Sequence, residues 1–179
     1  KPLVYGNDWS AATLLTDMNV EAKMIFVGHG VVSDEIGRND LKDADLKGKI
    51  AVIIQGPPRG YSAQKWTEVS DKIAPIPQLI TRGAAGVILV TNERAAMKGD
   101  FIVNQTGRRN VATAAVAAQR LPMPLLFLGD EARNKLFEGS GMTVDEAMDD
   151  ASDLEFQPME LKPSIKLHLR TKQTQATSP

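Results

Sequence analysis

The sequence contains no cysteine, and histidine occurs only twice, at His29 and His168. The absence of cysteine excludes disulfides, thiolate nucleophiles and cysteine-ligated metal sites. No apolar run approaches the roughly 20 residues that a helix needs to cross a bilayer. The formal net charge is only −1, so the basic excess typical of nucleic-acid-binding domains is missing. We therefore predict neither a nucleic-acid partner nor a membrane span.

The composition that is present is ordinary for a globular fold. Hydrophobic residues make up 42% of the chain and charged residues 24%, which is enough for a core that needs no metal or disulfide. There is no fixed-period repeat and no low-complexity tract, so a single domain over residues 1–179 is predicted. The chain begins with Lys1-Pro2, without an initiator methionine or a signal sequence. We expect it to be a piece of a longer protein.

The clearest pattern is two apolar runs joined by a polar loop. Residues 24–27 and 50–54 are continuous apolar runs, which is typical of strands buried on both faces. The loop at residues 34–49 is rich in charge and glycine, and no core could bury it unless its polar groups had partners. It ends in the turn Asp45-Leu46-Lys47-Gly48-Lys49, directly before the second run.

Proline and glycine set the bounds of the helix predicted after the second strand. Pro75 and Pro77 are tolerated only in a first turn, so the firm helix is expected over residues 76–82, with Gly83 beyond its end. Residues 61–69, which precede it, are predicted to be irregular or briefly helical.

Cap residues identify two helices further along the chain. Asp130 is predicted to cap a helix over residues 131–138, and Thr143 with Glu146 forms a capping-box pattern for a helix that ends near Asp150. The remaining expected elements are strands at 11–16, 87–91, 100–103, 121–128 and 164–171, and helices at 95–98 and 110–120.

The order of these elements predicts the fold class. Strands alternate with helices only in the middle of the chain, which favours an α/β fold that borders on α+β. We expect central buried strands with flanking helices, and a second layer of strands that comes from the two chain ends.

Four short segments, taken in order, resemble one family. They are F-V-G-H-G at residues 26–30, D-L-K-G-K at 45–49, G-A-A-G-V-I at 83–88 and G-M-T-V-D-E at 141–146. They are similar to segments of the protease-associated domain of M28-type zinc aminopeptidases. The resemblance implies a swivelling β/β/α fold with a core of about residues 22–139. It also implies that residues 1–21 and 140–179 connect to a peptidase domain that is absent from this chain.

The resemblance implies a non-catalytic role beside a peptidase active site. Such a domain shapes substrate access, contacts peptides, or mediates partner or homo-oligomer contacts. The parent would hydrolyse N-terminal peptide bonds with two zinc ions bound outside this chain, and it would be secreted, periplasmic or at the cell surface. Two alternatives remain open. One is a phosphohistidine-type swivelling domain with His29 as the carrier, and the other is a protease-associated module of a subtilase or a sorting receptor.

Patterns that could carry catalysis or bind metal are weak. Zinc needs three or four nitrogen, oxygen or sulfur ligands, yet neither His29 nor His168 stands in an H-x-D pair, and no adjacent Glu-Glu pair occurs. Gly28-His29-Gly30 lacks the third glycine of a dinucleotide fingerprint, and Ser62-x-x-Lys65 lacks the companion motifs of penicillin-recognising enzymes. Asp149-Asp150 is predicted to be solvated surface. We therefore predict no catalytic, cofactor-binding or metal-binding residue.

An arginine pair and two aromatic residues are the candidates for a contact surface. Arg108 and Arg109 lie in a polar segment, and Tyr61 and Trp66 follow a loop rich in glycine and proline. Arginine and aromatic side chains are favoured at binding hot spots. Asn104 begins an N-x-T acceptor pattern, which would mark a surface loop in a secreted eukaryotic protein.

Overall fold

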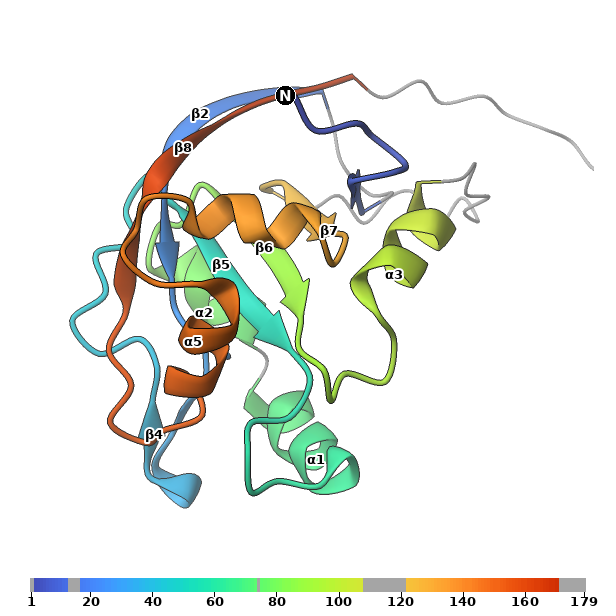
Figure 1. The fold of residues 1–179 in the computed structure, drawn as a ribbon. Coiled ribbons are helices and arrows are strands. Elements are labelled where there is room, and N and C mark those ends of the chain that lie inside the picture. The colour runs from blue at the N-terminus through green and yellow to red at the C-terminus, as the bar shows by residue number, and fades with distance from the viewer. Residues whose placement is uncertain (1, 13–16, 74, 108–121, 171–179) are drawn as a thin grey trace, which may run out of the picture.

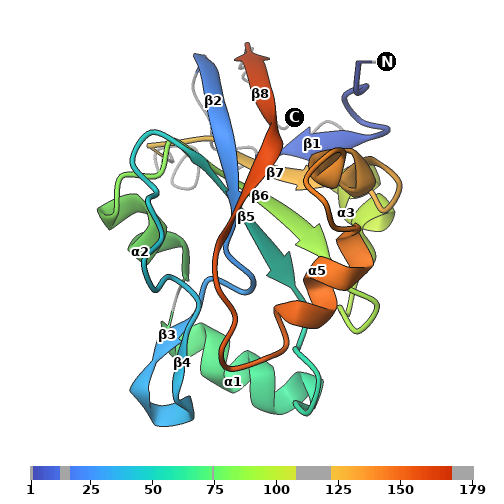
Figure 2. The same ribbon diagram turned by 60° about the vertical axis from the view of Figure 1, so that its left-hand side comes forward.

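The computed structural model describes residues 2–12, 17–73, 75–107 and 122–170, which form one mixed sheet flanked by helices (Figures 1 and 2). The sheet has six strands in the order β1-β7-β6-β5-β2-β8. These strands are β1 Trp9–Ala11, β2 Met18–Phe26, β5 Ile50–Gln55, β6 Gly86–Thr91, β7 Leu125–Leu128 and β8 Met159–Leu169. The four central strands, β2, β5, β6 and β7, run parallel, and the edge strands β1 and β8 are antiparallel to their neighbours.

The strands β5 and β6 form because nearly every side chain along them enters a core. In β5, Ile50, Val52 and Ile54 belong to the apolar cluster on one face of the sheet, whereas Ala51 and Ile53 belong to the cluster on the other face. A strand buried on both faces needs the continuous apolar run that the sequence provides, since successive side chains point to opposite sides.

The first face is covered by β8 and by two helical segments from the C-terminal part of the chain. These are the 3-10 segment η2 (Ala132–Phe137) and the helix α5 (Val144–Asp150). The ring of Phe26 on β2 meets the rings of Phe137 and Phe156 edge to face, with centroids 5.3 and 5.6 Å apart. This aromatic group joins the centre of the sheet to its C-terminal cover.

The second face is covered by α2 (Pro75–Thr81) and by the loop between β2 and β5. That loop contains a small hairpin, β3 Val32–Ser33 and β4 Arg38–Asn39, around the 3-10 turn η1 (Asp34–Ile36). Leu41 and Leu46 of the loop, together with Leu79 of α2, are at most 1% exposed. Part of the polar loop therefore packs on the second face of the sheet.

The two remaining helices lie at the margins of the sheet. The helix α1 (Ala63–Ile73) lies beyond the carboxyl end of β5, and α3 (Gly99–Thr106) lies near β7 and β1 (Figures 1 and 2). No helix among the described residues is both long enough and apolar enough to span a membrane.

The predicted α/β class, with central buried strands and flanking helices, is confirmed. The strands from the chain ends belong to the same hydrogen-bonded sheet, because β8 pairs with the edge of β2 that β5 leaves free. β5 pairs only with residues 24–26 of β2, so residues 18–23 extend with β8 as a two-stranded ribbon that curls over the sheet (Figure 1).

Several predicted elements are confirmed, although two strands begin four or five residues away from their expected starts, and residues 121 and 171 lie outside the described part. The strands expected at 50–54, 87–91, 121–128 and 164–171 correspond to β5, β6, β7 and β8, and the helix expected at 76–82 corresponds to α2. The strand expected at 24–27 begins six residues earlier, at Met18, because β8 supplies a partner. The strand expected at 11–16 overlaps β1 at Ala11, and residues 13–16 lie outside the described part.

The predicted capping box is confirmed. Thr143 Oγ1 accepts the backbone N–H of Glu146 at 3.2 Å, and the Glu146 carboxylate accepts the backbone N–H of Thr143 at 2.8 Å. Both orphan donors at the start of α5 are thereby satisfied.

Residues 61–69 were expected to be irregular or briefly helical, but Ala63–Ile73 is a helix of 11 residues. Ser62 Oγ accepts the backbone N–H of Lys65 at 3.2 Å, which satisfies one orphan donor at the helix start. The Ser62-x-x-Lys65 pattern therefore serves as a helix cap.

The strand expected at 100–103 and the helix expected at 95–98 are wrong. Residues 99–106 form α3, in which the buried positions Gly99 and Val103 are four residues apart, and the first N–H of the helix is bonded to Thr91 Oγ1 at 2.9 Å. Before it, Asn92 Oδ1 accepts the N–H of Arg94 at 3.0 Å and forms a turn in place of a helix. The helix expected at 110–120 lies outside the described residues.

The prediction that Asp130 caps a helix is also wrong. Residues 132–137 form a 3-10 segment without a side-chain cap. The Asp130 carboxylate instead accepts a hydrogen bond from Thr91 Oγ1 at 3.1 Å and lies 3.4 Å from Arg133 Nη1. A tertiary contact thus takes the side chain away from the local role that its position suggests.

Candidate functional site

The segment after β2 turns sharply and carries His29 into the interior. Gly28 and Gly30 have positive φ angles of 56° and 67°, a region that disfavours other residues. A Cβ atom at Gly28 would lie 3.0 Å from the ring of Phe156. The two glycines therefore allow the chain to reverse against the core, and His29 between them is only 3% exposed.

A buried ion pair holds this turn in place. Asp40 Oδ2 accepts the backbone N–H groups of His29 and Val31, each at 3.1 Å. Asp40 Oδ1 lies 2.6 Å from Arg38 Nε, and the two side chains are 1% and 0% exposed. Burial raises the pKa of the Asp40 carboxyl above its usual value, and the opposing charge of Arg38 limits this rise.

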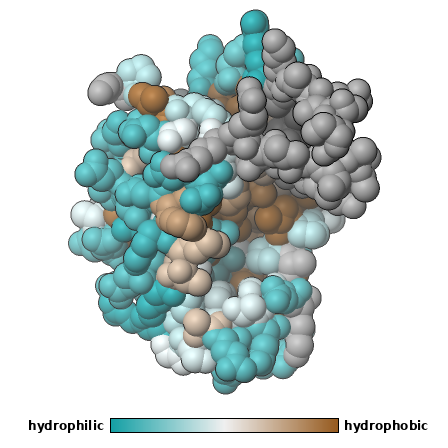
Figure 3. Space-filling view, turned by 90° about the vertical axis from the view of Figure 1, so that its right-hand side faces the viewer, coloured by the Kyte–Doolittle hydropathy of each residue, from teal (hydrophilic) through white to brown (hydrophobic). Residues whose placement is uncertain are grey.

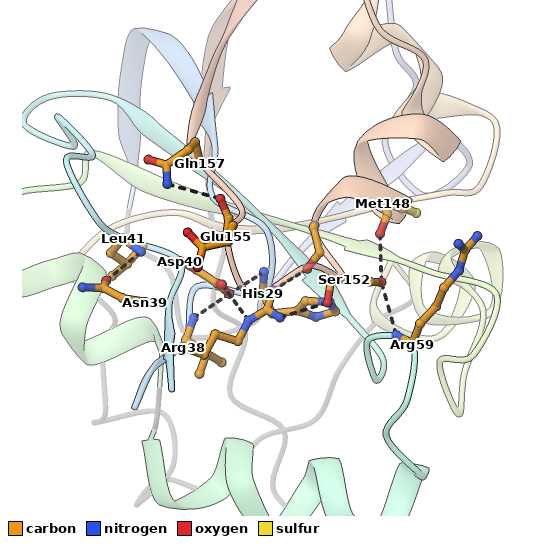
Figure 4. A network of polar contacts seen from close by, with 12 residues as sticks. His29, Arg38, Asn39, Asp40, Leu41, Arg59, Met148, Ser152, Glu155 and Gln157 are labelled. Carbon is orange, nitrogen blue, oxygen red and sulfur yellow. Dashed lines mark hydrogen bonds and ion pairs between the residues drawn. The ribbon is translucent and has the colours of Figure 1, made fainter. Parts of the chain in front are cut away.

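Arg38 extends the same network to the end of α5. Its Nη2 donates to the carbonyl of Ala151 and its Nη1 to that of Ser152, at 3.5 Å for the latter. Figure 4 shows Arg38 and Asp40 beside His29, with Ser152 between this cluster and Arg59. A side chain from the loop after β2 thereby satisfies carbonyls that a helix end leaves without partners.

The ring of His29 packs against aromatic side chains. Its centroid lies 5.0 Å from that of Trp66, which in turn lies 5.3 Å from the ring of Tyr61. Neither nitrogen of His29 has a hydrogen-bond partner among the described residues. Burial and the nearby positive charges of Arg38 and Arg94 lower the pKa of His29 to about 3, although the Ile54 carbonyl opposes them. His29 is therefore a neutral interior ring at physiological pH.

An open groove lies on the other side of Ser152. It encloses about 830 Å³ and is lined by Arg59, Gly60, Gly141, Met142, Glu146, Asp149, Asp150, Ser152 and Asp153. Four of these residues are acidic and one is basic. Arg59 pairs with Asp149, and its backbone N–H donates to Ser152 Oγ at 3.2 Å. The groove is thus a surface of net negative charge.

The aspartates that were expected to be plain surface belong to this groove. Glu146, Asp149, Asp150 and Asp153 are spaced three and four residues apart, which places their side chains on one side of α5 and the turn after it. This helical spacing is the signal that could have grouped them from the sequence.

The predicted contact residues have different settings. Tyr61 is half-buried, and Lys65 Nζ lies 5.6 Å from the centroid of its ring. Trp66 was expected at the surface but is only 6% exposed, because it lies between Tyr61 and His29. Arg108 and Arg109 lie outside the described residues.

A second surface feature is apolar. Hydrophobic side chains gather on the face that carries α3 (Figure 3). Phe101 of α3 and Met97 just before it are 52% and 54% exposed. Sequence reasoning missed both residues, because it placed Met97 in a helix at 95–98 and Phe101 in a strand at 100–103 and grouped neither with a surface.

The geometry limits the chemistry that the described residues can perform. They contain no group of three histidine, aspartate or glutamate side chains placed to hold a metal ion. Gly28-His29-Gly30 leads into β3 and not into a helix, so no helix N-terminus stands ready for a phosphate. The parallel strands also follow one another in sequence order across the sheet, so they lack the switch point where doubly wound sheets bind ligands.

Comparison with known proteins finds similarity in structure alone. No family model matches the chain, and no curated protein matches it. An aminopeptidase from Aneurinibacillus sp. strain AM-1 is similar with a TM-score of 0.41 and 15% identity, over 90% of this chain and 30% of that one. BSAP, a zinc aminopeptidase from Bacillus subtilis, is similar with a TM-score of 0.38 and 16% identity, over 89% of this chain and 28% of that one. The chain therefore spans about 30% of the length of these structures.

Proposed function

We propose that this chain is a non-catalytic accessory domain of the protease-associated type, joined in its parent to a zinc aminopeptidase domain. In this role it guides peptide or protein segments toward the neighbouring active site. The zinc ions and the groups that activate water belong to the linked domain, which would hydrolyse N-terminal peptide bonds. The proposal includes a parent that is secreted, periplasmic or at the cell surface.

The observation that carries the proposal is how the resembling segments meet. The D-L-K-G-K turn and the G-A-A-G corner are more than 30 residues apart, yet the Gly48 N–H donates to the Gly83 carbonyl at 2.9 Å, and the Ala85 N–H donates to the Lys49 carbonyl at 2.8 Å. The F-V-G-H-G segment meets the core at Phe156, and the G-M-T-V-D-E segment caps α5. The resembling residues support the backbone, which suits a domain whose role is to present a surface.

The acidic groove is the proposed contact surface. Its carboxylates on α5 and the following turn attract a positively charged segment, and the apolar side chain of Met142 adds a place for a hydrophobic group. Arg59 and Gly60 also line the groove, and Tyr61 follows them in the sequence. Contact with a basic peptide is thus the best match to the charge of this surface.

The geometry disfavours the phosphohistidine alternative. A carrier histidine must present a ring nitrogen to a phosphoryl donor, but both nitrogens of His29 are buried beneath Trp66. Incubation of the protein with a phosphoryl donor, followed by mass spectrometry, should give no adduct at His29. If the chain is instead a module of a subtilase or a sorting receptor, the linked domain would differ, but the interior around His29 would be the same.

The binding part of the proposal can be tested with defined peptides. We expect a lysine-rich decapeptide to shift backbone amide resonances of residues 141–153 in ¹H–¹⁵N spectra at low salt, and a glutamate-rich decapeptide to leave them unchanged. The double variant Asp150→Asn/Asp153→Asn should weaken the lysine peptide several-fold, because it removes two groove carboxylates. Asp145→Asn is the matched control, since Asp145 lies on α5 outside the groove lining. Equal weakening by both variants would argue against the groove.

The non-catalytic part has a separate test. With added zinc, the purified protein should not hydrolyse leucine p-nitroanilide above the buffer rate. Zinc-dependent turnover that is retained through stringent purification would contradict the proposal.

A further inference from the structure

The helix α1 is attached to the rest of the domain chiefly through one ring. Trp66 is its only described side chain that is buried, at 6% exposed. The side-chain hydrogen bonds of Gln64 to Glu68, Thr67 to Ala63 and Ser70 to Thr67 stay inside the helix. One bond from outside reaches its last residue, where Gln78 Nε2 of α2 donates to the Ile73 carbonyl at 3.1 Å. Figures 1 and 2 show α1 beyond the end of β5, away from both faces of the sheet. An element with so few buried contacts belongs to the parts of a fold that open locally at low cost.

His29 forms the surface on which Trp66 rests. The two rings meet edge to face at an interplanar angle of 68°, and His29 is 3% exposed beneath the indole. Neither imidazole nitrogen has a hydrogen-bond partner among the described residues, and the Ile54 carbonyl only partly offsets the effects of burial and positive charge that lower the pKa of His29.

The charged groups around His29 also oppose a proton on its ring. Arg38 on β4 and Arg94 on the segment after β6 act on it as positive charges. The nearby carboxylate of Asp40 is already engaged by Arg38 and by the backbone N–H groups of His29 and Val31. From α1 itself the group that faces the ring is the uncharged indole of Trp66. While α1 covers His29, its surroundings therefore favour the neutral form of the imidazole.

We propose that His29 and Trp66 form an acid-released latch, in which lifting of α1 exposes the imidazole to water and a proton taken up there keeps the helix open. The inference does not depend on the proposed accessory function. The exposed ring has an ordinary pKa of 6.5 and the buried ring one of about 3. The opening equilibrium of α1 should therefore rise roughly ten-fold between neutral pH and pH 5.5, and roughly 100-fold by pH 4.5.

Hydrogen exchange measures this opening directly. Amide exchange of the intact chain would be followed at pH 7.5 and pH 4.5 and corrected for the intrinsic chemical rate. We expect the opening constant of α1 amides to rise roughly 100-fold, and to exceed at both pH values that of β5 amides, which exchange only when the whole fold opens. The absence of a rise in α1, or an α1 opening constant no larger than that of β5, would overturn the proposal.

Two variants assign the effect to one histidine. His29→Phe keeps a ring against Trp66 and should abolish the acid dependence of α1 exchange, whereas His168→Gln should retain it. A retained dependence in His29→Phe would overturn the latch.

A second measurement covers the case in which His29→Phe does not fold. In a Trp9→Phe background, Trp66 is the single fluorophore of its kind, since the chain has two tryptophans. Its emission should shift to the red on acidification below about pH 5, before the far-ultraviolet circular dichroism of the sheet is lost. An emission that stays constant until the sheet unfolds would contradict the proposal.

Discussion

Two arginines reach the end of α5 from opposite sides, and they differ in burial more than in chemistry. Arg38 pairs with Asp40 at 0% and 1% side-chain exposure, whereas Arg59 pairs with Asp149 at 61% and 56%. The first pair has no water to replace a lost partner, so each charge depends on the other. The second pair is solvated, and salt screens it. The buried pair therefore organises the fold, whereas the exposed pair belongs to the groove that we propose as a contact surface.

The largest expected effect is the loss of one member of the buried pair. Asp40→Ala leaves the Arg38 charge unpaired and removes the acceptor of the His29 and Val31 N–H groups. It should lower the free energy of unfolding by about 3–5 kcal/mol, measured by urea denaturation at pH 7. Arg38→Met/Asp40→Leu should recover a large part of this loss, because it removes both charges. A double variant as unstable as Asp40→Ala would argue that backbone capping by Asp40 dominates.

The next effect is a pH dependence that His29 contributes. Its pKa is about 3 when folded and 6.5 when exposed, so the unfolded chain binds more protons between these values and stability falls as the pH drops. Each pH unit below 6.5 should cost about 1.4 kcal/mol. Asp40 works in the opposite direction, because its pKa is raised on folding. The difference between the wild type and His29→Phe isolates the histidine, and it should change by about 2 kcal/mol between pH 7.5 and pH 5.

A smaller effect is expected at the capping box of α5. Thr143→Ala removes the acceptor of the Glu146 N–H and should destabilise the fold by about 1 kcal/mol. Thr143→Ser keeps the hydroxyl and serves as the control in the same thermal or urea unfolding experiment. Equal losses in the two variants would show that the methyl group matters and the cap does not.

The smallest effect is expected at the exposed pair. Arg59→Gln should change the free energy of unfolding by less than about 1 kcal/mol, and 0.5 M salt should reduce the difference further. Because it removes the one basic side chain that lines the groove, it should strengthen binding of the lysine-rich peptide. A loss of several kcal/mol would mean that the two pairs are not distinguished by burial.

Elements that depend on local pattern could be predicted from the sequence. The continuous apolar runs of β5 and β6 require burial on both faces, so composition alone identifies them. The capping box at Thr143 is likewise local, because its two hydrogen bonds lie within four residues. The short run Phe101-Ile102-Val103 fits a strand or a helix, and the contact of Gly99 with Thr91 decides between them.

The candidate site depends on contacts across long sequence separations. Arg38 and Asp40 lie in a loop that reads as polar, and their burial becomes possible only because they pair with each other and with carbonyls more than 110 residues away. The sequence did indicate that such a loop would need partners. It did not indicate that Trp66 would lie on His29, since an aromatic residue in a glycine-rich region is equally compatible with an exposed contact.

We infer that His29 and the Arg38–Asp40 pair serve the interior of the fold. The most direct test is a nuclear magnetic resonance titration of the His29 ring in the intact protein from pH 8 to pH 5. We expect its Cε1–H resonance to stay at the position of neutral imidazole, because the buried ring has a pKa of about 3. A titration midpoint near pH 6.5 with the fold intact would show that His29 is accessible to water and would contradict this inference.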